Sequence, residues 1–261
     1  MPYFTNDGIK IHYEIEGEGL PVVMIHGFAS SLEGNWKQTN WVDFLKDEYQ
    51  LILIDCRGHG KSDKPTDPAY YGPKMIDDMI KLLEYLSIKK ANFFGYSMGS
   101  RLTFNILLSN PQLVKCAILG GFVLSIPNET EQVVSERRTL QIIEALRAKS
   151  KDQIKNPVAL RFRVFAESNN ANLNALAAIM GSGLQVQEKP AQLKERIKKI
   201  KVPVMTVVGS DDFIQGDKTL VAQLIPDACH FQIQGKDHLT VVPDPKFKMI
   251  VKAFLDYINR S

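Results

Sequence analysis

A serine lies in the pattern Gly95-Tyr96-Ser97-Met98-Gly99, which matches G-x-S-x-G. The pattern ends an apolar run at residues 91–95 and opens a helical pattern at residues 97–109. Glycines suit a tight turn from strand to helix, because a side chain at either position would collide with the neighbouring strand or helix. The turn would hold the Ser97 hydroxyl away from the sheet, at a helix N-terminus where negative charge is stabilised. We therefore predict that Ser97 is a nucleophile.

A serine hydroxyl is a poor nucleophile unless a base takes its proton. His238 follows the last apolar run and precedes the C-terminal helical pattern. Loops beyond the carboxyl ends of parallel strands are where sites form in such sheets. His238 is therefore the predicted general base. His12 and His230 lie within predicted strands, and we expect both to be structural.

The base needs a carboxylate that fixes its tautomer and stabilises its charged form. In sites with a strand–serine–helix turn, this acid lies between the serine and the histidine in the chain. The apolar run ending at Leu119 is followed by Gly120-Gly121-Phe122, which holds no carboxylate. The next run is followed by Gly209-Ser210-Asp211-Asp212. The residues themselves leave both Asp211 and Asp212 open as the acid.

Apolar runs alternate with helical patterns, which predicts an α/β fold with a mostly parallel sheet flanked by helices. Residues 3–6 and 9–15 are separated by Asp7-Gly8, a hairpin signal that should add antiparallel strands at one edge. Residues 123–201 show helical patterns only, and we predict a helical cap between core segments 1–122 and 202–261. The predicted central strands are 21–25, 50–55, 91–95, 114–119, 202–208 and 230–233. The predicted core helices are 36–47, 75–86, 97–109, 217–224 and 245–259. The predicted cap helices are 129–148, 151–167, 173–180 and 194–201.

The order and spacing of several motifs resemble those of α/β hydrolases. They are His26-Gly27-Phe28, the run DCRGHGKS at residues 55–62, the Ser97 turn, residues 209–212 and His238. The chain is most similar to small esterase-type members with a helical cap. The resemblance places the acid three residues after the glycine of the 209–212 segment, which selects Asp212. A serine in place of aspartate at the turn sets the chain apart from dehalogenases and epoxide hydrolases of this fold.

The resemblance also implies roles for residues around the serine. The N–H groups of Phe28 and Met98 would form the oxyanion hole. His26, Arg57 and His59 would be structural and would shape loops around the site. Ser100 departs from the family pattern, since many members have glycine there, and we expect it to crowd the turn slightly.

Apolar residues of the cap are candidates for the substrate pocket, which predicts a substrate with an apolar part. Phe122, Phe165 and Met180 are the chosen pocket residues, together with Phe162, Leu176 and Ile179. At helical spacing, such residues are more often part of core packing.

Charge and cysteine content narrow the expected setting. The 32 basic and 29 acidic residues leave a net charge of +3, which gives no reason to expect a nucleic-acid or membrane partner. The first residues lack the pattern of a signal peptide, and no apolar run approaches the ~18 residues of a membrane span. We expect a cytoplasmic protein with buried reduced thiols at Cys56, Cys116 and Cys229. No metal motif appears, and the single Gly-x-Gly at residues 58–60 is no dinucleotide fingerprint, so we expect no cofactor.

Three functions fit these residues. The first is hydrolysis of a carboxylic ester or a small lactone through an acyl-serine intermediate. The second uses the same triad to cleave a carbon–carbon bond or to form a peracid. The third is a ligand receptor or signalling protein that keeps the triad without rapid turnover. Fold alone does not choose between them, and turnover of a short aryl ester would separate the first from the third.

Overall fold

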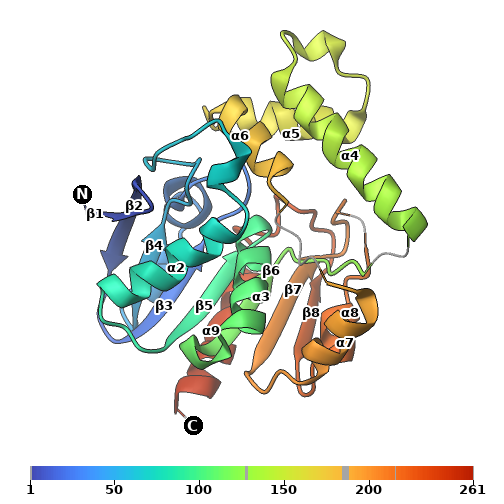
Figure 1. Cartoon of the computed structure of the whole chain (residues 1–261). Helices are drawn as coiled ribbons and strands as arrows, with labels where there is room; N and C mark the ends of the chain where they lie inside the picture. The colour runs from blue at the N-terminus through green and yellow to red at the C-terminus, as the bar shows by residue number, and fades with distance from the viewer. Residues whose placement is uncertain (1, 127–128, 184–187, 215, 261) are drawn as a thin grey trace.

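A single sheet runs through the centre of the computed structural model, which describes residues 2–126, 129–183, 188–214 and 216–260. The strand order is β1-β2-β4-β3-β5-β6-β7-β8 (Figure 1). β2 pairs antiparallel with β1 and β4, and all other neighbours are parallel, which confirms the predicted fold class. The strands are β1 (Tyr3–Asn6), β2 (Ile9–Glu16), β3 (Leu20–Ile25), β4 (Tyr49–Ile54), β5 (Ala91–Tyr96), β6 (Val114–Gly120), β7 (Val204–Gly209) and β8 (Cys229–Ile233).

The central strands bury both of their faces. Along β3, Val23 and Ile25 join one apolar core with α2 and α3, whereas Val22 and Met24 join a second core with α1 and α9. This alternation follows from the two-residue period of a strand and explains why the central runs read as continuously apolar. The core helices are α1 (Trp41–Leu45), α2 (Pro73–Tyr85), α3 (Met98–Ser109), α8 (Leu220–Leu224) and α9 (Pro245–Arg260), with short turns at Glu33–Lys37, Pro68–Tyr70 and Pro111–Leu113.

Helices α4 (Glu129–Arg147), α5 (Pro157–Ser168) and α6 (Leu173–Gly181) form a layer above the carboxyl ends of the parallel strands (Figure 1). We call these three helices the cap. The basic helix predicted at 194–201 corresponds to α7 (Pro190–Lys198), which lies beside α8 rather than in this layer. The cap limits of 123 and 201 stay a prediction.

Two of the predicted helical spans are each broken into two parts. The pattern at 36–47 is broken because Asn40 adopts the left-handed conformation at φ 60°, which separates the π-helical turn Glu33–Lys37 from α1. The pattern at 151–167 is split into a short turn at Lys151–Gln153 and α5. Here Asn156 Oδ1 accepts the N–H groups of Val158 and Ala159, so the helix begins at the intervening proline, which has no N–H to satisfy.

The three cysteines are free thiols with different surroundings. Cys56 and Cys116 are buried, as predicted, but Cys229 is exposed, so its predicted burial is wrong. It begins β8, the last strand of the sheet, where one edge of the strand has no neighbouring strand to cover it. Within the described ranges, no helix is both long enough and apolar enough to cross a bilayer.

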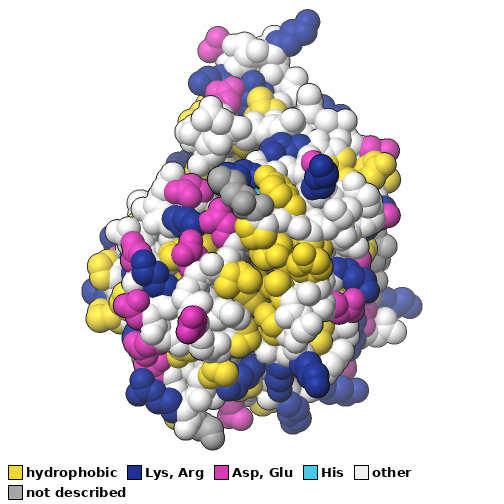
Figure 2. Space-filling view, turned by 90° about the vertical axis from the view of Figure 1, so that its left-hand side faces the viewer, with side chains coloured by type: hydrophobic (Ala, Val, Ile, Leu, Met, Phe, Trp, Pro, Cys, Tyr) yellow, Lys and Arg dark blue, Asp and Glu magenta, His cyan; other side chains and the backbone are white. Residues whose placement is uncertain are grey.

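Exposed apolar side chains lie on β1, on β2, at the start of β3 and at the end of α2. Tyr3, Ile15, Leu20 and Tyr85 are each more than a third exposed. Figure 2 views the molecule from the side on which β1 and β2 lie in Figure 1, and hydrophobic side chains gather on that face among charged ones. None of these four residues lines the cavity that opens beside Ser97.

Candidate active site

Ser97 alone makes the turn between β5 and α3. Its φ of 53° and ψ of −107° are rare for a residue with a side chain. A Cβ on Gly95 would lie 2.3 Å from the carbonyl oxygen of Gly99, and a Cβ on Gly99 would lie 1.9 Å from that of Ile25. Both positions therefore require glycine, for the steric reason predicted from the sequence. Ser97 therefore has a strained backbone conformation, and this conformation places its hydroxyl beyond the end of β5.

Ser97, His238 and Asp212 form a continuous hydrogen-bonded chain. Ser97 Oγ lies 2.8 Å from His238 Nε2, and His238 Nδ1 lies 2.8 Å from Asp212 Oδ2. A carboxylate only accepts hydrogen bonds, so Nδ1 carries the ring proton and Nε2 accepts from the serine hydroxyl. The second oxygen, Asp212 Oδ1, accepts the N–H of Ile214 at 2.9 Å, which fixes the carboxylate. His238 and Asp212 are each only 7% exposed, so bulk water barely screens their interaction.

Asp211, the alternative acid, lies outside this chain. Its side chain is exposed, and its Oδ1 accepts a hydrogen bond from Ser210 Oγ at 2.8 Å. Of the two candidates left open by the sequence, only Asp212 contacts the histidine in the structure.

The loop that follows β3 is held on both sides of Phe28. The N–H of Gly27 donates to Asn35 Oδ1 at 3.0 Å, and the N–H of Ala29 donates to His59 Nε2 at 3.2 Å. His26 Nδ1 lies 2.7 Å from the Gly27 carbonyl oxygen, which ties the loop a third time. These bonds leave the Phe28 peptide little freedom to rotate. His26 and His59 have the loop-shaping positions that the resemblance implied.

Burial keeps these two histidines neutral. It lowers the pKa of His26, and it lowers the pKa of His59 to about 3, where the neighbouring His26 adds to the effect. In the neutral ring, His59 Nε2 can accept from the loop while Nδ1 donates to the Arg57 carbonyl. Arg57 also has a structural position, because its Nε and Nη2 donate to the two oxygens of the buried Asp78 carboxylate, each at 2.6 Å.

Met98 is the first residue of α3, so its N–H has no acceptor within the helix. Ser100, two residues on, is buried, and its Oγ lies 2.7 Å from the carbonyl oxygens of both Gly95 and Gly120. The hydroxyl therefore has acceptors on two strands, and the turn accommodates it by hydrogen bonding.

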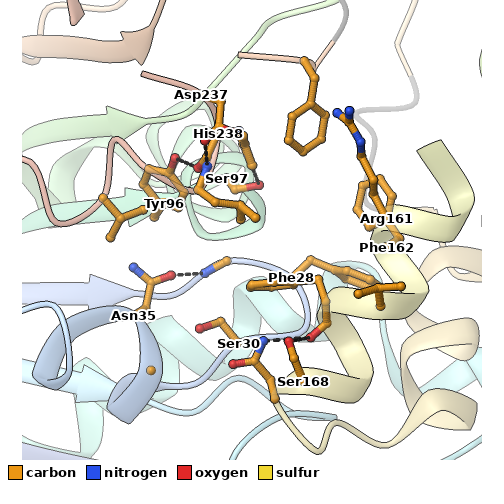
Figure 3. Close-up of a pocket in the computed structure, with 18 of the residues that line it drawn as sticks. Phe28, Ser30, Asn35, Tyr96, Ser97, Arg161, Phe162, Ser168, Asp237 and His238 are labelled. Carbon is orange, nitrogen blue, oxygen red and sulfur yellow. Dashed lines mark hydrogen bonds between the residues drawn. The ribbon is translucent and has the colours of Figure 1, made fainter. Parts of the chain in front are cut away.

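A cavity of about 810 Å³ opens beside Ser97 and His238. Figure 3 shows Arg161 and Phe162 of α5 across this cavity from Ser97 and His238. Of the six pocket candidates named from the sequence, Phe162 and Phe165 line it. Phe122 and Met180 do not: Phe122 packs on Phe104, with ring centroids 5.2 Å apart, and Met180 packs against the adjoining apolar core.

Comparison with known proteins settles the family. The sequence model described as "alpha/beta hydrolase fold" matches residues 21–245. The chain belongs to the α/β-hydrolase fold family. The 2-hydroxy-6-oxo-6-(2'-aminophenyl)hexa-2,4-dienoic acid hydrolase of Metapseudomonas resinovorans is 26% identical, over 97% of this chain and 89% of that protein.

Two solved structures share the fold over nearly the whole chain. The enol-lactonase from Burkholderia xenovorans LB400 has a TM-score of 0.72 and 22% identity, covering 97% of this chain and 99% of that one. A structure from a study of carboxylesterases of Nitrososphaera gargenis has a TM-score of 0.77 and 21% identity, covering 99% of each chain.

Sequence reasoning missed two residues of this α/β hydrolase that touch the site. Tyr96, a variable position of G-x-S-x-G, donates its hydroxyl hydrogen bond to the carbonyl oxygen of His238. Burial raises the pKa of the Tyr96 hydroxyl well above its usual value, which keeps it a neutral donor. Asn35, in the π-helical turn, holds the Gly27 amide. Neither role has a sequence signal, because both depend on contacts between distant segments. Within the described ranges, no group of three or more His, Cys, Asp or Glu side chains could hold a metal ion.

Proposed function

We propose that this α/β hydrolase cleaves a carboxylic ester or a small lactone through an acyl-serine intermediate. The observation that carries the proposal is the unbroken chain Ser97 Oγ–His238–Asp212 at the end of a cavity large enough for a small organic substrate. Acyl transfer requires an oriented serine, a base whose ring nitrogen carries no proton, and a buried carboxylate.

In the first half-reaction, Ser97 Oγ attacks the substrate carbonyl carbon while His238 Nε2 takes the hydroxyl proton. The N–H groups of Phe28 and Met98 serve as the oxyanion hole, and each such donor is worth about 3 kcal/mol in comparable enzymes. His238 then gives its proton to the leaving alkoxide. Water, activated by the same histidine, hydrolyses the acyl-serine and regenerates the hydroxyl. Asp212 stabilises the imidazolium in both halves.

The experiment compares Ser97→Ala with Ser168→Ala, a second serine that lines the same cavity. Ser97→Ala should fold normally and lose about 10⁴- to 10⁶-fold in kcat on a short aryl ester. Ser168→Ala should retain activity within a few-fold, and a fluorophosphonate probe should label wild type at Ser97 alone. Labelling at another serine, or undiminished activity in Ser97→Ala, would disprove the assignment.

Cleavage of a carbon–carbon bond is the second candidate, and the name of the Metapseudomonas resinovorans relative favours it. The same triad would serve, with a ketone carbonyl in place of the ester. Assays of one enzyme preparation with an aryl ester and with a vinylogous diketone acid distinguish ester hydrolysis from cleavage of a carbon–carbon bond. Binding without turnover of either would indicate the receptor function instead.

A further inference from the structure

The cap contributes one arginine to the wall of the cavity. Arg161 lies on α5, and its guanidinium carbon is 5.3 Å from the centre of the Phe213 ring. That ring in turn lies 5.4 Å from the His238 ring. A single aromatic side chain therefore contacts both the cap arginine and the histidine of the triad. An arginine stacked on an aromatic face keeps its hydrogen-bonding edge available.

The fold does not use the charge of Arg161. Within the described ranges, its guanidinium has no carboxylate oxygen within 4.0 Å and makes no hydrogen bond. Arg163, two residues further along the same helix, is the opposite case. It is 6% exposed, pairs with Glu167 at 2.7 Å and donates to the carbonyl oxygens of Ala145 and Ala148 at 2.8 Å. Arg163 ties α5 to the end of α4, whereas Arg161 is exposed at the cavity wall and, among the described residues, stacks on the Phe213 ring.

The carboxylates nearest to the cavity already accept hydrogen bonds from other groups of the chain. Asp237 lines it, but its Oδ1 accepts hydrogen bonds from the N–H groups of Leu239 and Thr240 and from the Thr240 hydroxyl. The Asp212 carboxylate is bound to His238 and Ile214. Much of the remaining wall is apolar, and it includes Phe28, Leu160, Phe162, Phe165, Phe213 and Val242.

We propose that Arg161 binds a carboxylate carried by the substrate, so the substrate class is a carboxylate-bearing ester or lactone. The inference rests on the hydrolase function proposed above. A guanidinium presents two parallel N–H donors that match the two oxygens of a carboxylate, and a partly apolar wall strengthens that pairing. The reacting carbonyl would lie at Ser97 and the carboxylate at the cap, with the apolar wall between them.

The test uses two 4-nitrophenyl esters of adipic acid, one with a free terminal carboxylate and one with that carboxylate methylated. Wild type should prefer the charged ester. Arg161→Met should lower kcat/KM for the charged ester by about 10- to 100-fold, mainly through KM, and change the neutral ester by less than threefold. Arg161→Lys should fall between wild type and Arg161→Met, because lysine keeps the charge but loses the two-pronged geometry.

Arg137→Met is the matched control, since Arg137 is an exposed arginine of the same cap that does not line the cavity. It removes the same net charge, so any long-range effect on an anionic substrate should appear in both variants. A loss in Arg161→Met alone supports direct contact. Equal losses in the two variants, or none in either, would overturn the proposal.

Binding gives a readout that does not depend on turnover. Adipate should competitively inhibit hydrolysis of the neutral ester by wild type, and this inhibition should weaken at least tenfold in Arg161→Met. Inhibition by inorganic phosphate without inhibition by adipate would overturn the carboxylate assignment. If neutral esters are cleaved at Ser97 while neither adipate nor the charged ester depends on Arg161, only this inference fails. If no ester is cleaved at all, the proposed function fails with it.

Discussion

The core side and the cap side of the cavity differ in how their side chains are held. On the core side, Ser97, His238 and Asp212 are joined by hydrogen bonds of 2.8 Å, and Gly27 and Ala29 have their amides bound by side chains. On the cap side, the lining residues of α5 are held by apolar packing, by one ring stack at Arg161 and by the Phe162–Phe28 contact. Ser168 Oγ donates a hydrogen bond within its own helix, to the Phe165 carbonyl oxygen at 2.9 Å.

This difference separates two tasks. Acyl transfer needs atoms placed to within a fraction of an ångström, and a dense hydrogen-bond network on strand ends supplies that placement. Choosing a substrate needs shape and one or two polar contacts, which a helix above the sheet can supply with few bonds. Changes on the core side should therefore alter kcat, and changes on the cap side should alter KM and substrate preference.

The largest expected effect tests the core side. Asp212→Asn should lower kcat by about 10⁴-fold with little change in KM, because an amide can hold the wrong tautomer of His238 and removes the stabilising charge. Asp211→Asn is the matched control, and it should lower kcat by less than threefold, since the exposed Asp211 carboxylate accepts from Ser210 and lies away from His238. Steady-state kinetics on one aryl ester decides the matter. The reverse result would mean that the acid is Asp211 and that the Ser97–His238–Asp212 geometry is not the working one.

Sequence reasoning succeeded where one local pattern decides the structure. The central strands β3 to β7 are predicted because runs that are buried on both faces are continuously apolar. β1 and β2 are predicted from the Asp7-Gly8 turn signal between them, and β8 from a short apolar run, although most of its side chains are not buried. The Ser97 turn was predicted because its two glycines are a steric requirement visible in five residues. His238 can be picked out from its place after the last strand, and the structure puts its Nε2 2.8 Å from Ser97 Oγ; its role as the base stays a prediction.

It failed where several orientations of a helix satisfy the same pattern. On the cap helices, Phe162 and Phe165 line the cavity but Met180 does not, and nothing in their spacing distinguishes the cavity from the adjoining core. Phe122 lies in the loop after β6 and packs on Phe104. Arg161 has no sequence signal either, because exposed arginines are ordinary on helices and its place in the cavity wall depends on how α5 lies over the sheet. Tyr96 and Asn35 hold the site through contacts with segments far away in the chain, and no single-sequence signal reports those.

Lowering the pH should destabilise the core side before the cap, because all five histidines lie outside α4, α5 and α6. Burial holds the pKa of His59 at about 3 in the folded chain, against about 6.5 when unfolded. Between these values the unfolded chain binds a proton that the folded chain does not. The free energy of unfolding should therefore fall, as pH drops below about 6.5, by up to about 1.4 kcal/mol per pH unit. His26 has its pKa lowered too and should add in the same direction.

Urea unfolding at pH 7 and at pH 5 measures this loss. His59→Gln keeps an acceptor for the Ala29 amide and removes the titrating ring, so its stability should fall less steeply with acid than that of wild type. Identical slopes in the two proteins would show that His59 does not carry the effect.

The smallest expected effect lies where the two sides meet. Phe162 of the cap contacts Phe28 of the core loop, with ring centroids 5.9 Å apart and planes at 71°. Such an edge-to-face pair is worth about 0.5–1.5 kcal/mol. If it helps to hold the Phe28 amide at the oxyanion, Phe162→Leu should lower kcat by about two- to tenfold, although Phe162 belongs to the cap. Phe165→Leu, one turn along the same wall, should change KM and preferred acyl length while leaving kcat within twofold. Equal effects of the two substitutions on KM alone would mean that Phe162 is only a wall, and that the division between the two sides is complete.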